Sequence, residues 1–159
     1  MSTSSSKSRS GLALVGFILI TFAAPVLSAF IDMPGAWYMA LQKPSWNPPS
    51  WLFGPAWTLL YTLMAVAAWL VWKRVGFGKP LTLYFVQLAL NAAWTPIFFR
   101  AHQPGWALFE IVLLWVAILA TLLSFRRVSS AAGWLFVPYL AWVSFATVLN
   151  FTLWRLNAA

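Results

Sequence analysis

The sequence predicts an all-α integral membrane protein, a bundle of five transmembrane helices. Three observations support this fold class. Hydrophobic residues make up 62% of the 159 positions, and Asp32 and Glu110 are the only acidic residues. A soluble domain of this length would need many more charges on its surface. The apolar runs are about 20 residues long, as spanning helices require, and they lack the alternation and the roughly 10-residue length of membrane-barrel strands.

The chain is expected to have a short tail and one membrane domain. We predict a disordered, Ser-rich basic tail at residues 1–10 and a single domain at 11–157. The first apolar run exceeds the roughly 7–15 residues of a secretory signal, so it is interpreted as a retained span. Pro96 is expected to kink the end of its helix. The spans are predicted at about 11–31, 51–72, 80–99, 106–125 and 131–154.

The longest connection precedes the second span and contains the tandem prolines Pro48 and Pro49. Two prolines in a row fix φ and push Asn47 out of the helical region, so the second helix can begin only after them. Three Trp residues bracket this break: Trp46, Trp51 and Trp57. The simpler interpretation is an aromatic belt at the membrane surface followed by a helix start. The alternative is a hinge between a lid at 37–50 and a cavity wall at 51–61.

Lys and Arg residues stand singly or in pairs at the ends of the apolar runs. This pattern is typical of topology signals and argues against nucleic-acid binding. The side of the N-terminus carries Lys7, Arg9, Lys73, Arg74, Lys79, Arg126 and Arg127, and the other side carries Lys43, Arg100 and Arg155. Because basic short loops stay cytoplasmic, we expect a cytoplasmic N-terminus if the protein resides in a cytoplasmic membrane. Residence in an outer membrane stays open.

Few polar residues interrupt the spans, so each one is a functional candidate. Gln87 and Asn91 are four residues apart and share a helix face. Hydrogen bonding between helices is the favoured interpretation for Gln87, whereas Asn91 stays open between that role and ligand contact. Glu110 is expected to form an ion pair with Arg100, with proton handling as the alternative. His102, in the turn between them, is interpreted as interfacial.

The composition also excludes several kinds of chemistry. The chain has no Cys and a single His, which leaves no plausible set of metal ligands, so we expect no metal site and no required cofactor. No Ser/His/Asp triad, phosphate loop or nucleotide fingerprint can be assembled. These absences argue against a hydrolase or an ATP-driven pump.

Aromatic residues follow helical spacing on two spans. Trp57 and Tyr61 lie on the second span, and Trp142, Ala146 and Leu149 follow one line on the fifth. Such stripes usually reflect packing alone. Here many rings gather toward one side of the membrane: Trp51, Trp57, Tyr61, Trp94, Trp106 and Trp142. An apolar, aromatic cavity with a few amides would suit a flat hydrophobic ligand such as a tetrapyrrole or a sterol.

Four stretches of the chain carry a resemblance to a known family. They are W-Y-x-x-L-Q-K-P-S-W-N-P-P-S-W-L-F-G-P-A-W-T-L-L-Y (37–61), Q-L-A-L-N-A-A-W-T-P-I-F-F (87–99), G-W-A-L (105–108) and P-Y-L-A-W-V-S-F-A-T-V-L-N (138–150). The chain resembles the translocator protein / tryptophan-rich sensory protein family, formerly the peripheral benzodiazepine receptor. The similarity covers nearly everything from Trp37 onward, in the same order and with similar spacing.

The resemblance implies a five-helix bundle, often dimeric, whose first loop caps a pocket open toward one leaflet. In relatives that pocket binds porphyrins such as protoporphyrin IX, and also isoquinoline-carboxamide and benzodiazepine-type ligands. Protoporphyrin IX or a haem-like tetrapyrrole is therefore the expected ligand, with membrane lipid and a second copy of the chain as partners. Carried over by motif, the pocket would comprise Trp51, Phe53, Trp57, Tyr61, Asn91, Trp106, Leu113, Trp142, Ala146 and Leu149.

Two departures from the family pattern bear on sterol binding and on dimerisation. The cholesterol motif of animal relatives has a Tyr before its Arg, where this chain has Phe151 ahead of Arg155, which puts sterol recognition in doubt. The small-residue dimer motif is replaced by Thr82 and Val86. A small-xxx-small pair remains available further along the same span: Ala89 and Ala93.

Three hypotheses for function follow. The first is a tetrapyrrole-binding translocator or sensor without its own energy source. The second is an enzyme that photo-oxidises porphyrin, with Trp51, Trp57 or Trp142 as the redox-active ring. The third is a sterol-handling or scaffold protein. The physiological ligand, and the choice between transport, sensing and degradation, stay open at the level of sequence.

Overall fold

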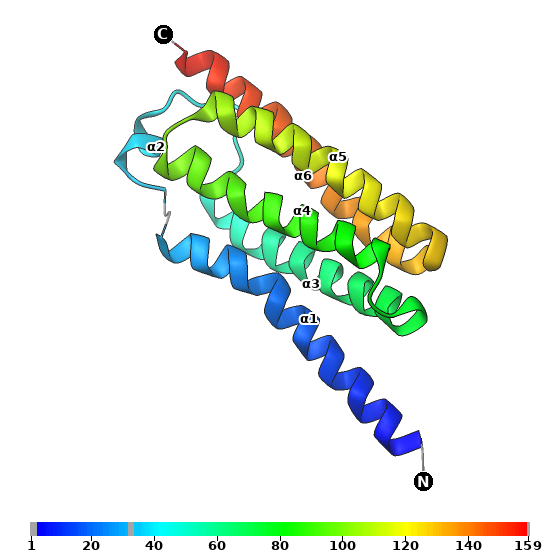
Figure 1. The fold of residues 1–159 in the computed structure, drawn as a ribbon. Coiled ribbons are helices and arrows are strands. Elements are labelled where there is room, and N and C mark those ends of the chain that lie inside the picture. Colours follow the sequence, from blue (N-terminus) through cyan, green and yellow to red (C-terminus); the bar gives the residue numbers. More distant parts are fainter. Residues whose placement is uncertain (1–2, 32–33, 159) are drawn as a thin grey trace.

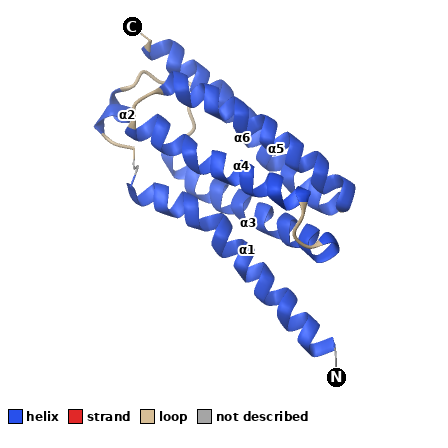
Figure 2. Cartoon of the chain, viewed as in Figure 1, coloured by secondary structure: helices blue, strands red, loops and turns tan. Residues whose placement is uncertain are grey.

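The computed structural model describes residues 3–31 and 34–158. Within those residues the chain forms helices joined by loops, and no strand (Figures 1 and 2). In chain order they are α1 (Thr3–Ile31), α2 (Ala36–Ala40), α3 (Ser50–Val75), α4 (Lys79–Thr95), the π-helical turn η1 (Pro96–Arg100), α5 (Pro104–Val128) and α6 (Ser130–Asn157). Five helical segments are long and apolar enough to cross a membrane, with α4 and η1 forming one of them. The predicted fold class, an all-α bundle of five spans, is confirmed.

Helices α3 to α6 run side by side, and α1 packs along α3 and α4 (Figure 1). The two ends of the chain lie at opposite ends of the bundle, and α2 lies at the same end as the C-terminus (Figure 1). Helix α1 begins at Thr3, inside the segment for which a disordered tail is predicted. Once a helical turn has formed, each further residue adds a backbone hydrogen bond, so the apolar helix can extend back through the Ser-rich segment before Gly11. The indole of Trp69 also donates to the Ser10 carbonyl at 2.9 Å.

Proline and glycine set the helix ends near the aromatic residues. Helix α3 begins at Ser50, directly after Pro49, as the tandem prolines predict. It ends at Val75, and the next residue, Gly76, has a φ of 64°, a conformation that glycine adopts without steric cost. Helix α4 gives way at Pro96 to a π-helical turn. Proline lacks the N–H that would continue the α-helical ladder, so the expected irregularity at this position is present.

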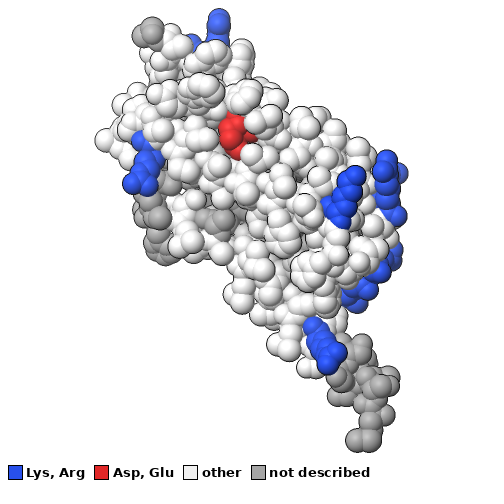
Figure 3. All heavy atoms as spheres, in the orientation of Figure 1, with Lys and Arg blue, Asp and Glu red and all other residues white. Residues whose placement is uncertain are grey.

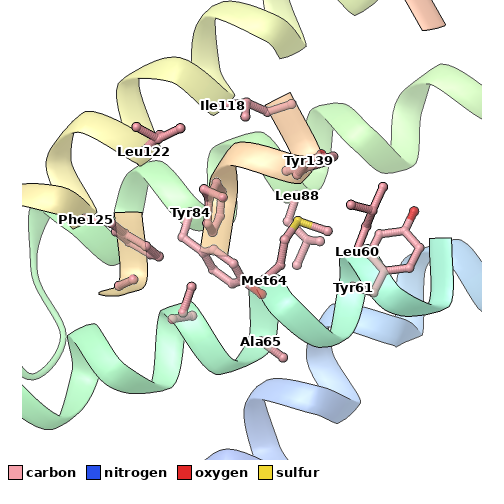
Figure 4. Packing of buried hydrophobic residues seen from close by; sticks show 14 of the residues in the cluster. Leu60, Tyr61, Met64, Ala65, Tyr84, Leu88, Ile118, Leu122, Phe125 and Tyr139 are labelled. Atoms are coloured by element: carbon pink, nitrogen blue, oxygen red, sulfur yellow. The ribbon is translucent and has the colours of Figure 1, made fainter. Parts of the chain in front are cut away.

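The described spans bury one face and expose the other. A core of aliphatic and aromatic side chains lies between α3, α4, α5 and α6, and Figure 4 shows Met64, Tyr84, Leu122 and Phe125 within it. Many large apolar side chains face outward instead, for example Leu19 at 66% exposed and Val116 at 55%. Lys and Arg lie toward the ends of the bundle, and the broad surface between them is uncharged apart from one acidic group (Figure 3). Both features are those of a protein surrounded by lipid.

Candidate functional site

The aromatic cluster

Five aromatic rings meet between α3 and α6, from the side of the first loop (residues 34–49, between α1 and α3) to the middle of the two helices. We define this aromatic cluster as Phe53, Trp57, Tyr61, Tyr139 and Trp142. Trp57 is at its centre: it stacks on Tyr61 with ring centroids 5.2 Å apart and planes 25° apart. It also makes edge-to-face contacts with Tyr139 at 6.2 Å and with Trp142 at 6.4 Å. The ring of Phe53 lies edge-on to Trp142 at 6.0 Å.

Helical spacing produces this cluster. Trp57 and Tyr61 are four residues apart on α3, and Tyr139 and Trp142 are three apart on α6, so each pair projects from one face of its helix. Because α3 packs on α6, the two faces meet. The burial is graded: Tyr139 is 0% exposed and Tyr61 is 6% exposed, whereas Phe53, Trp57 and Trp142 are half-buried. The cluster therefore has a buried floor and a more accessible rim.

Polar side chains beneath the aromatic cluster

A chain of hydrogen bonds lies beneath the aromatic cluster. The Tyr61 hydroxyl donates to Asn91 Oδ1 at 2.7 Å, and Asn91 Nδ2 donates to the Tyr139 hydroxyl oxygen at 2.9 Å. The Tyr139 hydroxyl in turn donates to Gln87 Oε1 at 3.0 Å. Within the described part of the chain, the one partner of Gln87 Nε2 is the sulfur of Met64, at 3.9 Å. The helix-linking role predicted for Gln87 is confirmed, since its amide joins α4 to α6.

A second set of polar contacts ties α4, α5 and α6 together, from the loop end of the bundle to the middle of α5 and α6. The Trp94 indole donates to Asn150 Oδ1 at 3.0 Å, and Asn150 Nδ2 donates to the Pro104 carbonyl at 2.8 Å. The Trp115 indole donates to Ser144 Oγ at 2.8 Å. These contacts satisfy polar groups that neither lipid nor an apolar core could satisfy.

Predicted residues outside the cluster

Several residues of the pocket implied by the resemblance lie apart from the aromatic cluster. Trp51 is 72% exposed, Trp106 is 68% exposed and Leu113 is 45% exposed, so all three side chains face out of the single chain. Ala146 is half-buried against the main core. Leu149 is only 7% exposed and packs in a second cluster with Phe98, Ala107 and Leu153.

Sequence reasoning did not assign Tyr139 or Gln87 to the site. Both are fully buried and hydrogen-bonded to each other beneath the aromatic cluster. Tyr139 stands one helical turn before Trp142, and Gln87 stands one turn before Asn91. That spacing is the signal that could have identified them, because residues three or four apart share a helix face.

Glu110 does not form the predicted ion pair. Its side chain is 7% exposed, and neither carboxylate oxygen has a hydrogen-bond partner among the described residues. Arg100, in contrast, is exposed at the end of η1. The prediction of an Arg100–Glu110 pair is therefore wrong: the buried face of α5 takes Glu110, while the π-helical turn directs Arg100 outward. Asp32, the other acid, lies outside the described residues.

The first loop and its contacts

The first loop reaches the helix ends around the aromatic cluster. The Trp37 ring stacks on His102 at 4.4 Å and lies edge-on to Phe98 at 5.7 Å. Trp46 contacts Phe145 at 5.9 Å, and Phe145 lies 5.8 Å from Trp142 of the aromatic cluster. His102 adopts a φ of 53° in the turn between η1 and α5. The loop thus packs against both η1 and α6.

Two polar contacts hold this loop in place. Asn157, at the end of α6, accepts from the Gln42 backbone N–H and donates to the Gln42 carbonyl, each at 2.9 Å. Lys43 Nζ donates to the carbonyls of Tyr38 at 2.7 Å and Leu41 at 3.1 Å, just after α2, where the helix dipole favours a cation. Burial raises the pKa of the Tyr38 phenol above its ordinary value. Tyr38 therefore stays a neutral hydrogen-bonding group at physiological pH.

Among the described residues, no three His, Cys, Asp or Glu side chains come together in a way that could hold a metal ion. The site is made of aromatic rings, amides and phenols. Such groups bind by stacking and hydrogen bonding.

Relationship to known proteins

The fold and the site define a multi-pass helical membrane protein with an aromatic cluster between α3 and α6. The sequence profile of the TspO/MBR family matches residues 17–155. The chain belongs to that family.

Named relatives come from animals and from bacteria. The chain is 51% identical to the translocator protein of Homo sapiens over 136 residues, covering 82% of this chain and 80% of that protein. It is 47% identical to the tryptophan-rich protein TspO of Chlorobaculum tepidum, with 82% and 85% covered. It is 43% identical to the tryptophan-rich sensory protein of Cereibacter sphaeroides, with 91% and 92% covered. The predicted family resemblance is confirmed.

Proposed function

We propose that this membrane protein binds flat tetrapyrroles, such as protoporphyrin IX, at the aromatic cluster, and acts in their transport or sensing. The observation that carries the proposal is the stack of Trp57 on Tyr61, with Trp142 edge-on at 6.4 Å from Trp57. Large rigid rings that are half-buried offer a stacking surface at little entropic cost. Family membership supports the choice of a translocator or sensory role.

The experiment is a titration of the purified protein with protoporphyrin IX, followed by quenching of Trp fluorescence. Trp142→Ala removes one wall of the aromatic cluster, and Ala146→Phe adds bulk one helical turn away on the same face. Each change is expected to weaken porphyrin affinity at least about tenfold, the usual effect of losing a buried aromatic anchor. Trp134→Ala, at an exposed Trp on the same helix, is the matched control. Unchanged affinity in both cluster variants would show that the porphyrin does not bind there.

A second candidate function is light-dependent oxidation of the bound porphyrin. Contact between two indoles and a phenol, Trp57, Trp142 and Tyr61, favours it, because indole and phenol rings are readily oxidised. Illumination of the protein with protoporphyrin IX in air should then yield new absorbing products. If Trp57→Phe and Trp142→Phe variants consume porphyrin as fast as the parent, the indoles take no part in that chemistry.

A further inference from the structure

Asn91 has little hydrogen-bonding capacity left for a ligand. A side-chain amide has one carbonyl oxygen and two N–H donors. In Asn91 the oxygen accepts from Tyr61, and the nitrogen donates to Tyr139. The residue is only 7% exposed, and its two partners are 6% and 0% exposed. The amide is enclosed by the phenols that it binds.

These hydrogen bonds run in one direction, from Tyr61 in the buried floor of the aromatic cluster to Gln87 in the core. Tyr61 donates to Asn91, Asn91 donates to Tyr139, and Tyr139 donates to Gln87. Each phenol hydrogen is used toward the interior of the bundle. The ring of Tyr61 is therefore held at its hydroxyl end, while its face supports the indole of Trp57.

We propose that Asn91 is a positioning residue. Its hydrogen bond fixes the plane of the Tyr61 ring, and the stacked Tyr61 ring in turn fixes the plane of the Trp57 indole. Asn91 makes no hydrogen bond to the polar groups of the ligand. The inference rests on the proposed function and specifies how the site recognises its ligand class. The ligand stacks on the rings of Trp57 and Tyr61, whose orientation is already fixed before binding. Flat aromatic ligands therefore bind whether or not they carry a polar edge that faces Asn91.

The reason for such an arrangement is pre-organisation. A ring that can rotate loses conformational entropy when a ligand orders it, whereas a ring already fixed does not. A hydrogen bond inside a bundle surrounded by lipid also has no competing water. The Asn91 amide of α4 joins the buried phenols of Tyr61 on α3 and Tyr139 on α6. These hydrogen bonds hold the stacking surface in place where the three helices meet.

The test compares two porphyrins that differ only in their polar edge: protoporphyrin IX, which carries two carboxylates, and its dimethyl ester. Affinities of both are measured for the parent, for Asn91→Leu, for Tyr61→Phe and for the double variant. The expected result is a loss of about twofold to tenfold in each single variant, equal for the two porphyrins, which is the size of an aromatic stacking contribution. The double variant should lose no more than either single change, because both break the same contact.

Tyr84→Phe is the matched control. Tyr84 is another fully buried tyrosine of the same core, and its hydroxyl bonds with Thr21, away from Trp57. Its replacement should lower thermal stability as Tyr61→Phe does, while leaving both porphyrin affinities unchanged. Near-UV circular dichroism of the ligand-free protein adds a readout of ring orientation, which should change in Asn91→Leu and Tyr61→Phe more than in the control.

The outcomes separate the two proposals. A loss in Asn91→Leu that is confined to the diacid would mean that Asn91 contacts the ligand directly, and it would overturn the positioning role. Unchanged affinity for both porphyrins in Tyr61→Phe would overturn it as well, and that variant retains its ring should Asn91→Leu fail to fold. If the parent binds neither porphyrin, the proposed function fails and the positioning role fails with it.

Discussion

The two ends of the α5–α6 pair are held together in different ways. At the end away from the first loop, the helices touch at the level of the backbone: a Cβ added to Gly133 would lie 2.6 Å from Arg126 Cβ and 2.9 Å from Arg126 Cα. At the loop end, a Cβ added to Gly105 would meet only the Trp154 indole, at 3.2 Å. The helices are joined there by side chains, both apolar, such as Ala107 with Leu149 and Leu153, and polar, such as Asn150 with the Pro104 carbonyl.

This difference indicates where the molecule can adapt. Backbone-level packing has no rotamers with which to respond to a change, so the end near Gly133 behaves as a rigid anchor. Contacts through side chains and a loop can open locally at a smaller cost in free energy. The first loop and the Phe53 side of the aromatic cluster lie toward that adaptable end.

The largest expected effect tests the rigid end. Gly133→Ala should lower the free energy of unfolding by about 1–3 kcal/mol, because the added methyl collides with Arg126 and over-packing costs that much. Thermal unfolding in detergent measures it. Gly16→Ala is the control, since nothing lies within 4 Å of a Cβ at that position, and it should be neutral or stabilising. Equal stability of the two variants would contradict the rigid-anchor interpretation.

The next effect concerns the tandem prolines at the start of α3. Replacing Pro48 and Pro49 together with Ala should speed porphyrin dissociation on the order of fivefold, because the unliganded loop gains conformational freedom. Stability should change less than ligand retention. Stopped-flow recovery of Trp fluorescence after dilution measures the off-rate. If the off-rate is unchanged, this stretch is only an interfacial belt and does not hold the loop over a ligand.

A smaller effect is expected where the loop meets α6. Asn157→Ala removes two hydrogen bonds to the Gln42 backbone and should cost about 0.5–1 kcal/mol of local stability. Faster amide hydrogen exchange at Gln42 would show it. Gln42→Ala is a matched control, since the contact uses the backbone of that residue and should survive. Comparable exchange rates in both variants would mean that Asn157 does not restrain the loop.

The smallest effect is expected at Trp51. Its ring is 72% exposed, and it lies outside the aromatic cluster, whereas Trp57 is the centre of that cluster. Trp51→Ala should therefore change porphyrin affinity less than about twofold, and Trp57→Ala should change it several times more. Fluorescence titrations of the two variants compare them directly. A larger loss in Trp51→Ala would bring Trp51 back into the site, as the family resemblance implies.

Much of the molecule can be predicted from the sequence for physical reasons that act locally. Scarcity of charge and runs of about 20 apolar residues require spanning helices, since lipid cannot satisfy an open backbone. Tandem prolines set the start of α3 because each proline keeps the residue before it out of the helical region. Pro96 sets the irregular end of α4 because it lacks a backbone N–H. The spacing of Trp57 and Tyr61 on one helix, and of Tyr139 and Trp142 on another, follows from 3.6 residues per turn.

Contacts between helices were decided by the tertiary structure alone. No local pattern distinguishes an Asn91 that meets a ligand from one enclosed by Tyr61 and Tyr139, because the partners come from helices 30 and 48 residues away. The same holds for Glu110: nearness in sequence suggested Arg100 as its partner, but helix rotation buries the carboxylate and leaves the guanidinium outside. Sequence determines which residues share a face, and packing determines what each face meets.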